Sequence, residues 1–154
     1  DYLLTDEDFL FVDFGCTYRN YVSDNGFTLA MRPLSGKQLD KYKTLHACIQ
    51  AGVDTIAPGV KSSEIQTAMA QVLDQQNVQA SLPHGHGLGL KIRDYPIIVP
   101  KNDLYIRDDC VEIPSDLPSE TNMVVNLEAS IFRLEMGPYT LSNPFLSQQT
   151  DVNP

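Results

Sequence analysis

The 154-residue chain contains no tryptophan and three cysteines, Cys16, Cys48 and Cys110. The cysteines are far apart and lack the short spacings of a zinc knuckle or a disulfide scaffold, so we expect three reduced thiols and a cytoplasmic protein. Apolar runs are only a few residues long, so we expect no membrane-spanning helix. The first eight residues are acidic where a signal peptide would be basic, so we expect no signal peptide.

Basic residues are also scarce. The chain has 11 Lys and Arg against 20 Asp and Glu, which gives a net charge of −9. Nucleic-acid binding needs clustered positive charge, so we expect no nucleic-acid partner. An acidic excess fits either a solvated surface or carboxylates gathered around a divalent cation.

The pattern of apolar residues predicts an α+β domain rather than alternating β-α-β units. We expect a buried strand, a hairpin with its turn at Asp24-Asn25-Gly26, and two amphipathic helices, the second with a capping box at Ser63 and Gln66. A glycine-rich segment, unlike a helix or an ordinary strand, precedes the last strands. These elements are expected at residues 9–15, 18–31, 37–56, 63–73, 84–90, 123–132 and 139–146.

Four side chains that could bind a metal lie inside or at the end of strands or tight loops: Asp13, Asp24, His86 and Glu128. Burying an ionised carboxylate costs several kcal/mol unless a counter-charge or hydrogen bonds offset it. Each residue alone is explained as well by pairing with a basic residue or, for His86, by an exposed loop. Three carboxylates and one imidazole together are a ligand set suited to Mn, Fe, Co or Zn.

Ordered motifs carry a resemblance to a known family. VDFG is followed by YVSD, whose aspartate comes eleven positions after that of VDFG, and HGHGLGL and MVVNLE come later in the chain. With these motifs the chain resembles the pita-bread-fold metallopeptidases, which include methionine aminopeptidase, Xaa-Pro aminopeptidase, prolidase and creatinase. It is most similar to the Xaa-Pro aminopeptidase and prolidase branch. The resemblance implies a curved antiparallel sheet covered by helices.

The resemblance also implies an activity and a site. Asp13 would bind one metal, Asp24 would bridge two, and His86 and Glu128 would bind the other. A metal-bound hydroxide would attack the first peptide bond of short or Xaa-Pro peptides. The residues that the resemblance places in catalysis are Glu128, His84 and Arg93.

Two of the departures from the family pattern bear on the site. Leu141 stands where the family has a bridging glutamate, and Glu135 is the only substitute nearby. Arg93 stands where the family has a substrate-binding histidine, and arginine cannot act as a neutral imidazole. We therefore expect one tightly bound metal ion rather than two.

The resemblance covers the metal-binding C-terminal half of the family's domain. We therefore expect residues 1–154 to form a single, partial domain that lacks its N-terminal half. Its expected partners are a peptide substrate and either a second copy or that missing half. Two other functions stay open: a catalytically impaired module that binds peptides or protein partners, as in histone-chaperone relatives, and a creatinase-like hydrolase that needs no metal.

Overall fold

The computed structural model describes residues 2–78, 83–101, 106–108, 111–113, 116–130 and 145–152. Along the chain, its two helices follow four N-terminal strands and precede six C-terminal ones. In chain order the elements are β1 (Phe9–Phe14), β2 (Thr17–Tyr18), β3 (Tyr21–Val22), β4 (Asn25–Ala30), α1 (Gly36–Thr55), α2 (Ser62–Gln75), β5 (Gly85–Leu88), β6 (Asp94–Ile97), β7 (Ile106–Asp108), β8 (Val111–Ile113), β9 (Val124–Ser130) and β10 (Phe145–Asp151).

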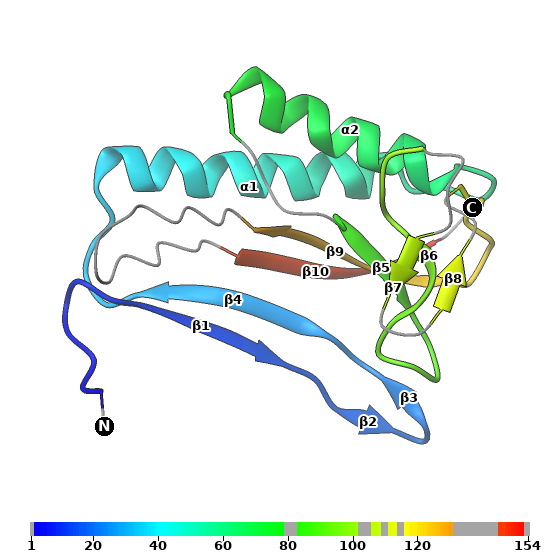
Figure 1. Cartoon of the computed structure of the whole chain (residues 1–154), viewed down its shortest axis with the longest axis horizontal. Coiled ribbons are helices and arrows are strands. Elements are labelled where there is room, and N and C mark those ends of the chain that lie inside the picture. The colour runs from blue at the N-terminus through cyan, green and yellow to red at the C-terminus, as the bar shows by residue number, and fades with distance from the viewer. Residues whose placement is uncertain are drawn as a thin grey trace.

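Six of the strands form one antiparallel sheet in the order β1-β4-β10-β9-β5-β6. Both helices lie on the same face of this sheet, and α1 packs against α2, β9 and β10 (Figure 1). The predicted α+β class is therefore confirmed. Among the described residues, neither helix is both long and apolar enough to cross a membrane.

The hydrophobic core lies between the helices and the centre of the sheet. Gly52 lets α1 approach the sheet closely, because a side-chain Cβ at this position would lie 2.7 Å from Leu127 Cδ1 on β9. The fully or nearly buried members of this core are Leu45, Cys48, Ile49, Ile65, Met69, Leu73, Ile98, Val125, Leu127, Ala129 and Val152. Strand β9, which supplies Val125, Leu127 and Ala129, is thereby held against the helices.

The start of α2 differs from the prediction. The helix begins at Ser62, and the Glu64 carboxylate accepts a hydrogen bond from Lys61 N at 3.0 Å, so the capping box expected at Ser63 and Gln66 is wrong. Ser63 already lies in the first helical turn, where its hydroxyl is free to reach a loop. Its Oγ donates to Asp116 Oδ1 at 2.6 Å.

The predicted hairpin turn at Asp24-Asn25-Gly26 is also wrong. The chain reverses at Arg19 and Asn20, between β2 and β3, where φ is 51° and 71°. Positive φ at both central residues matches the twist of the flanking strands, which favours the turn there. Residues from Asn25 onward pair with β1 instead, and Gly26 lies opposite Asp13.

The glycine-rich segment is a strand, contrary to the prediction. Strand β5 lies inside the sheet between β9 and β6. Gly87 has no side chain to obstruct its neighbour, since a Cβ there would lie 2.0 Å from Tyr95 O. The last predicted strand, residues 139–146, falls mostly outside the described residues, and β10 begins at Phe145.

Candidate metal centre

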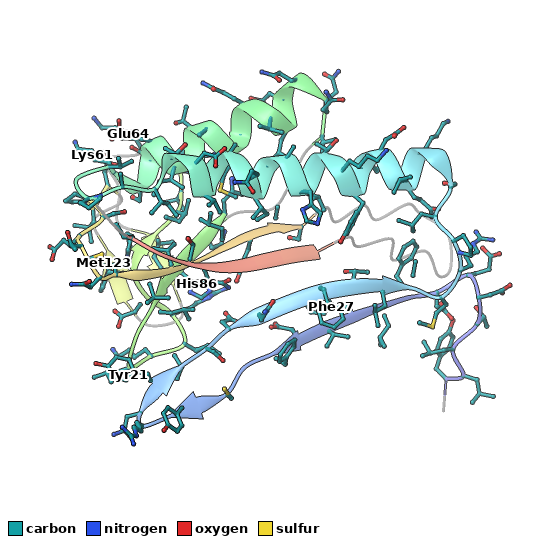
Figure 2. The ribbon with its side chains drawn as sticks, turned by 180° about the vertical axis from the view of Figure 1, so that it is seen from behind. Tyr21, Phe27, Lys61, Glu64, His86 and Met123 are labelled. Atoms are coloured by element: carbon teal, nitrogen blue, oxygen red, sulfur yellow. The ribbon has the colours of Figure 1, made fainter. Side chains whose placement is uncertain are left out.

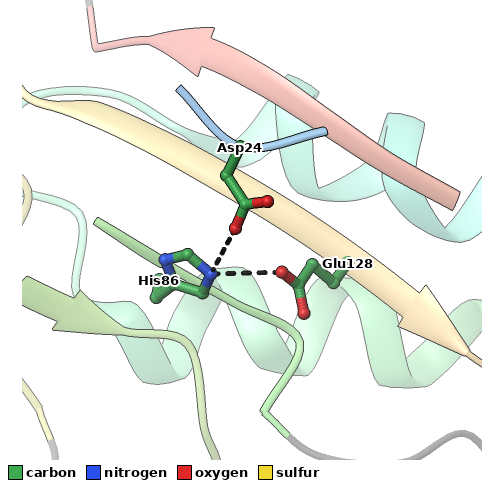
Figure 3. A group of neighbouring side chains, drawn as sticks. All are labelled: Asp24, His86 and Glu128. Atoms are coloured by element: carbon green, nitrogen blue, oxygen red, sulfur yellow. Dashed lines mark hydrogen bonds and ion pairs between the residues drawn. The ribbon is translucent and has the colours of Figure 1, made fainter. Parts of the chain in front are cut away.

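Three of the four predicted ligands meet at one point. Asp24 comes from the residues just before β4, His86 from β5 and Glu128 from β9, and one ligand atom of each lies within 4.8 Å of the others (Figure 3). His86 Nε2 is 3.3 Å from Asp24 Oδ2 and 3.1 Å from Glu128 Oε1. Pairing of β5 with β9 places His86 opposite Asn126, two residues from Glu128.

The imidazole of His86 is fixed by a second contact and is only 1% exposed. Its Nδ1 lies 3.0 Å from Gly87 O, and because a carbonyl can only accept, Nδ1 carries the proton in this bond. Nε2 therefore faces two carboxylate oxygens and needs either a second proton or a cation. Burial lowers the pKa of His86. The hydrogen bonds to Glu128 and to the Gly87 carbonyl, with the negative charges of Glu128 and Asp24, raise this pKa by more, so that it lies above the ordinary value for histidine.

The carboxylate of Asp24 is crowded by negative charge. Its side chain is 13% exposed, and burial is the main reason that its pKa is raised. His86 lowers this pKa, Glu128 and Asp13 raise it, and a hydrogen bond with Asn126 lowers it. A divalent cation would neutralise this crowding, so two carboxylate oxygens and one imidazole nitrogen fit a first-row metal ion.

Asp13 lies near this centre without joining it. It is exposed on β1 and pairs in register with Gly26. The group of close ligand atoms found among the described residues does not include it, although its charge reaches Asp24. Its role as a ligand stays a prediction.

The two other predicted catalytic residues lie in different surroundings. His84 is 3% exposed, and its Nδ1 has no hydrogen-bond partner among the residues that the structure describes. Burial alone lowers its pKa, so the Asp24 and Glu128 carboxylates that raise the pKa of His86 exert no comparable effect on His84. Arg93 is exposed in the connection between β5 and β6. Leu141 and Glu135 lie outside the described residues.

Sequence analysis missed Asn126, which supports the ligands. It is fully buried on β9, and its Nδ2 donates to Glu128 Oε1 at 3.0 Å. It also hydrogen-bonds Asp24, so a single amide contacts both carboxylates. One signal could have revealed it: an amide in the middle of the apolar run VVNLEAS needs a buried polar partner.

Comparisons with known proteins agree with this geometry. The sequence profile of metallopeptidase family M24 matches residues 1–144. An Xaa-Pro dipeptidase from Lactobacillus helveticus is 29% identical over 98 residues, which are 62% of this chain and 27% of that protein. The chain therefore spans about a quarter of the length of that relative.

Solved structures extend the likeness to almost the whole chain. Dipeptidase PepE from Mycobacterium ulcerans superposes with a TM-score of 0.81 at 25% identity, covering 97% of this chain and 36% of PepE. The N-terminal domain of FACT complex subunit SPT16 from chickpea gives a TM-score of 0.77 at 18% identity, covering 98% of this chain and 34% of that one. The pita-bread fold is thereby confirmed.

Proposed function

Because the chain belongs to metallopeptidase family M24, we propose that it is the metal-binding part of an aminopeptidase or dipeptidase acting on short or Xaa-Pro peptides. The observation that carries this proposal is the meeting of Asp24, His86 and Glu128 within 4.8 Å. Relatives named as Xaa-Pro dipeptidase and dipeptidase PepE support the substrate class.

In this proposal Asp24, His86 and Glu128 hold one metal ion tightly, and Asp13 adds a weaker second position. Manganese, iron, cobalt and zinc all suit these donors. When bound, such an ion activates water and polarises the peptide carbonyl. Asn126, which hydrogen-bonds Asp24 and Glu128, would orient both carboxylates toward the ion.

Arg93 and His84 are proposed to contact the substrate. The Arg93 guanidinium carries several N–H donors and can donate hydrogen bonds to the carbonyl oxygens of a short peptide. The Nδ1 atom of His84 is buried and has no partner within the described part of the chain, so a hydrogen-bonding group of the substrate would satisfy it. Glu128 would serve the reaction both as a ligand and as a base.

A second candidate is a module that binds peptides or protein partners without catalysis. The observation that favours it is Arg93, an exposed cation at a position where the family resemblance implies a histidine. The likeness to the SPT16 domain shows only that the fold occurs in a subunit of another complex. This candidate predicts no bound metal and no hydrolysis.

Elemental analysis of the full-length protein, with hydrolysis of Leu-Pro, separates the two candidates. We expect about one metal ion per chain and activity that a chelator abolishes. Glu128→Gln should remove both, whereas Glu120→Gln, which changes an exposed carboxylate in the loop before β9, should remove neither. A metal-free protein that binds peptides and does not cleave them after metal addition would support the second candidate and contradict the first.

A further inference from the structure

A pocket of about 400 Å³ lies at the hairpin formed by β2 and β3, and none of the roles above uses it. Its walls are mostly apolar, and they are formed by Cys16, Tyr18, Arg19, Tyr21, Val22 and Ser23. A volume of this size, apolar walls and few polar groups are typical of small-molecule sites. Tyr18 and Tyr21 are 70% and 66% exposed, so their rings are open to a ligand.

Short hydrogen bonds join Cys16 and Ser23, two residues that line the pocket. Ser23 N donates to Cys16 O at 2.8 Å, and Cys16 N donates to Ser23 Oγ at 3.1 Å. Gly15 permits this approach, since a Cβ there would lie 2.2 Å from Ser23 O. Cys16 and Ser23 are therefore held in place, while the rings of Tyr18 and Tyr21 stay exposed.

Two connections link the pocket to the segments that carry the metal centre. Ser23, which lines the pocket, is followed directly by the ligand Asp24. Val22 N donates to Gly89 O at 3.0 Å, which ties the hairpin to the segment that follows His86. Tyr21 and His86 accordingly lie at the same end of the molecule (Figure 2).

The chemistry of the lining indicates the ligand. Arg19 is the one basic residue among the six that line the pocket, and none of the six is acidic. Its guanidinium lies 5.3 Å from the centre of the Tyr18 ring, which places a positive charge beside an aromatic face. Aromatic faces pack against flat apolar rings, and a guanidinium pairs with a carboxylate.

We propose that this pocket is a specificity subsite for short peptides, in which the tyrosines contact an apolar or ring-containing side chain and Arg19 pairs with the peptide's free carboxylate. This inference rests on the proposed function, because the metal centre fixes where the scissile bond lies. In a chain with a net charge of −9, Arg19 offers local attraction to an anionic peptide end.

Protection of Cys16 from alkylation tests the subsite without any catalysis. Cys16 lines the pocket and is exposed, whereas burial raises the pKa of Cys48 to about 12 and makes it a slow internal reference. We would treat the chelated full-length protein with iodoacetamide and follow Cys16 by mass spectrometry. Phe-Pro should slow this alkylation severalfold, and Gly-Gly should not.

Matched variants locate the effect. Tyr21→Ala should remove the protection by Phe-Pro, whereas Tyr2→Ala, which changes an equally exposed tyrosine far from the hairpin in sequence, should keep it. The unmodified chain should be protected more by Phe-Pro than by Phe-Pro amide, which has no free carboxylate, and Arg19→Gln should abolish this difference. Circular dichroism checks that the fold of the variant is unchanged. Equal protection by Gly-Gly, or protection that survives both hairpin variants, would overturn the subsite.

The outcomes also separate this inference from the proposed function. Hydrolysis of Leu-Pro without any protection of Cys16 by Phe-Pro would overturn the subsite and leave the peptidase standing. Protection of Cys16 in a protein that binds metal but never hydrolyses peptides would keep the peptide pocket and contradict the peptidase. A protein ligand that protects Cys16 when Phe-Pro does not would point to the second candidate function.

Discussion

Two groups of strands in the sheet, β5 with β9 and β1 with β4, position the metal ligands in different ways. Strand β9, which carries Glu128, packs under the helices with Leu127 fully buried. Strand β5, which carries His86, is buried inside the sheet between β9 and β6. Asp24 directly precedes β4, which pairs with β1 at the edge of the sheet in an outer hairpin, and Leu29 on β4 is 45% exposed. The inner ligands are therefore positioned by the core, whereas Asp24 depends on a peripheral hairpin and on the amide of Asn126.

The largest expected effect tests that difference in packing. Leu127→Ala removes a fully buried side chain that touches the helices and should lower the free energy of unfolding by about 2–5 kcal/mol. Leu29→Ala makes the same change on the outer hairpin and should cost less than about 1 kcal/mol, because the side chain is already half in water. Urea unfolding followed by circular dichroism measures both. Equal losses would show that the hairpin contributes to the core as much as β9 does.

The second effect concerns Asn126, whose amide contacts Glu128 on β9 and Asp24 before β4. Asn126→Ala should weaken metal binding about 10- to 100-fold, because Asp24 and Glu128 both lose the donor that orients them. Asn25→Ala, an exposed amide at the start of β4, is the control and should leave affinity unchanged. Competition with a chromophoric chelator gives both constants. Unchanged affinity in Asn126→Ala would mean that the carboxylates are positioned by the strands alone.

A third comparison uses two glycines of α1. A Cβ at Gly52 would lie 2.7 Å from Leu127 Cδ1 and 2.9 Å from Met69 Sδ, whereas a Cβ at Gly36 meets no atom within 4 Å. Gly52→Ala should lower the free energy of unfolding by about 1 kcal/mol, since the crowding exceeds the gain in helix propensity. Gly36→Ala should raise it by up to about 1 kcal/mol. Thermal unfolding of both variants gives the sign of each change in stability. A stabilising Gly52→Ala would show that α1 packs loosely against Leu127 and Met69.

Much of the fold could be predicted from sequence, because apolar periodicity follows the strands and helices. The helix expected at residues 37–56 is α1, and the strand expected at 9–15 is β1. Long-range pairing explains the errors. HGHGLGL looks unlike a strand until β6 and β9 lie on both sides of it, where glycines are required for close approach.

The site shows the same limit. Asp24, His86 and Glu128 were predicted because each is a polar residue of metal-binding type in an apolar or glycine-rich setting, and the structure brings them together. Asn126 was missed because an amide gives no signal of metal binding, and its role depends on which two carboxylates flank it in space. The roles of Asp13, His84 and Arg93 stay predictions.

The smallest expected effect concerns the pH dependence of the hydrogen bond between Ser63 on α2 and Asp116 in the loop before β9. Burial raises the pKa of Asp116, but hydrogen bonds from the Ser63 hydroxyl and backbone amide, with the charges of Lys61 and Lys101, lower it below 3.8. A carboxylate with a lowered folded-state pKa contributes stability in full above its unfolded value, and this contribution disappears as the pH falls through the folded value.

Asp116→Asn should therefore lower the free energy of unfolding by about 1 kcal/mol near pH 7. The amide oxygen can still accept from Ser63, so the loss is the charged part of the interaction. The difference between the unmodified chain and the variant should shrink as the pH falls below about 4, toward the lowered pKa of Asp116. Glu7→Gln breaks an ion pair with Arg32 in which both side chains are largely exposed, and it should change stability by less than about 0.5 kcal/mol at either pH. Urea titrations at pH 7 and pH 3 measure these differences, and an Asp116→Asn deficit that persists undiminished at pH 3 would contradict the lowered pKa.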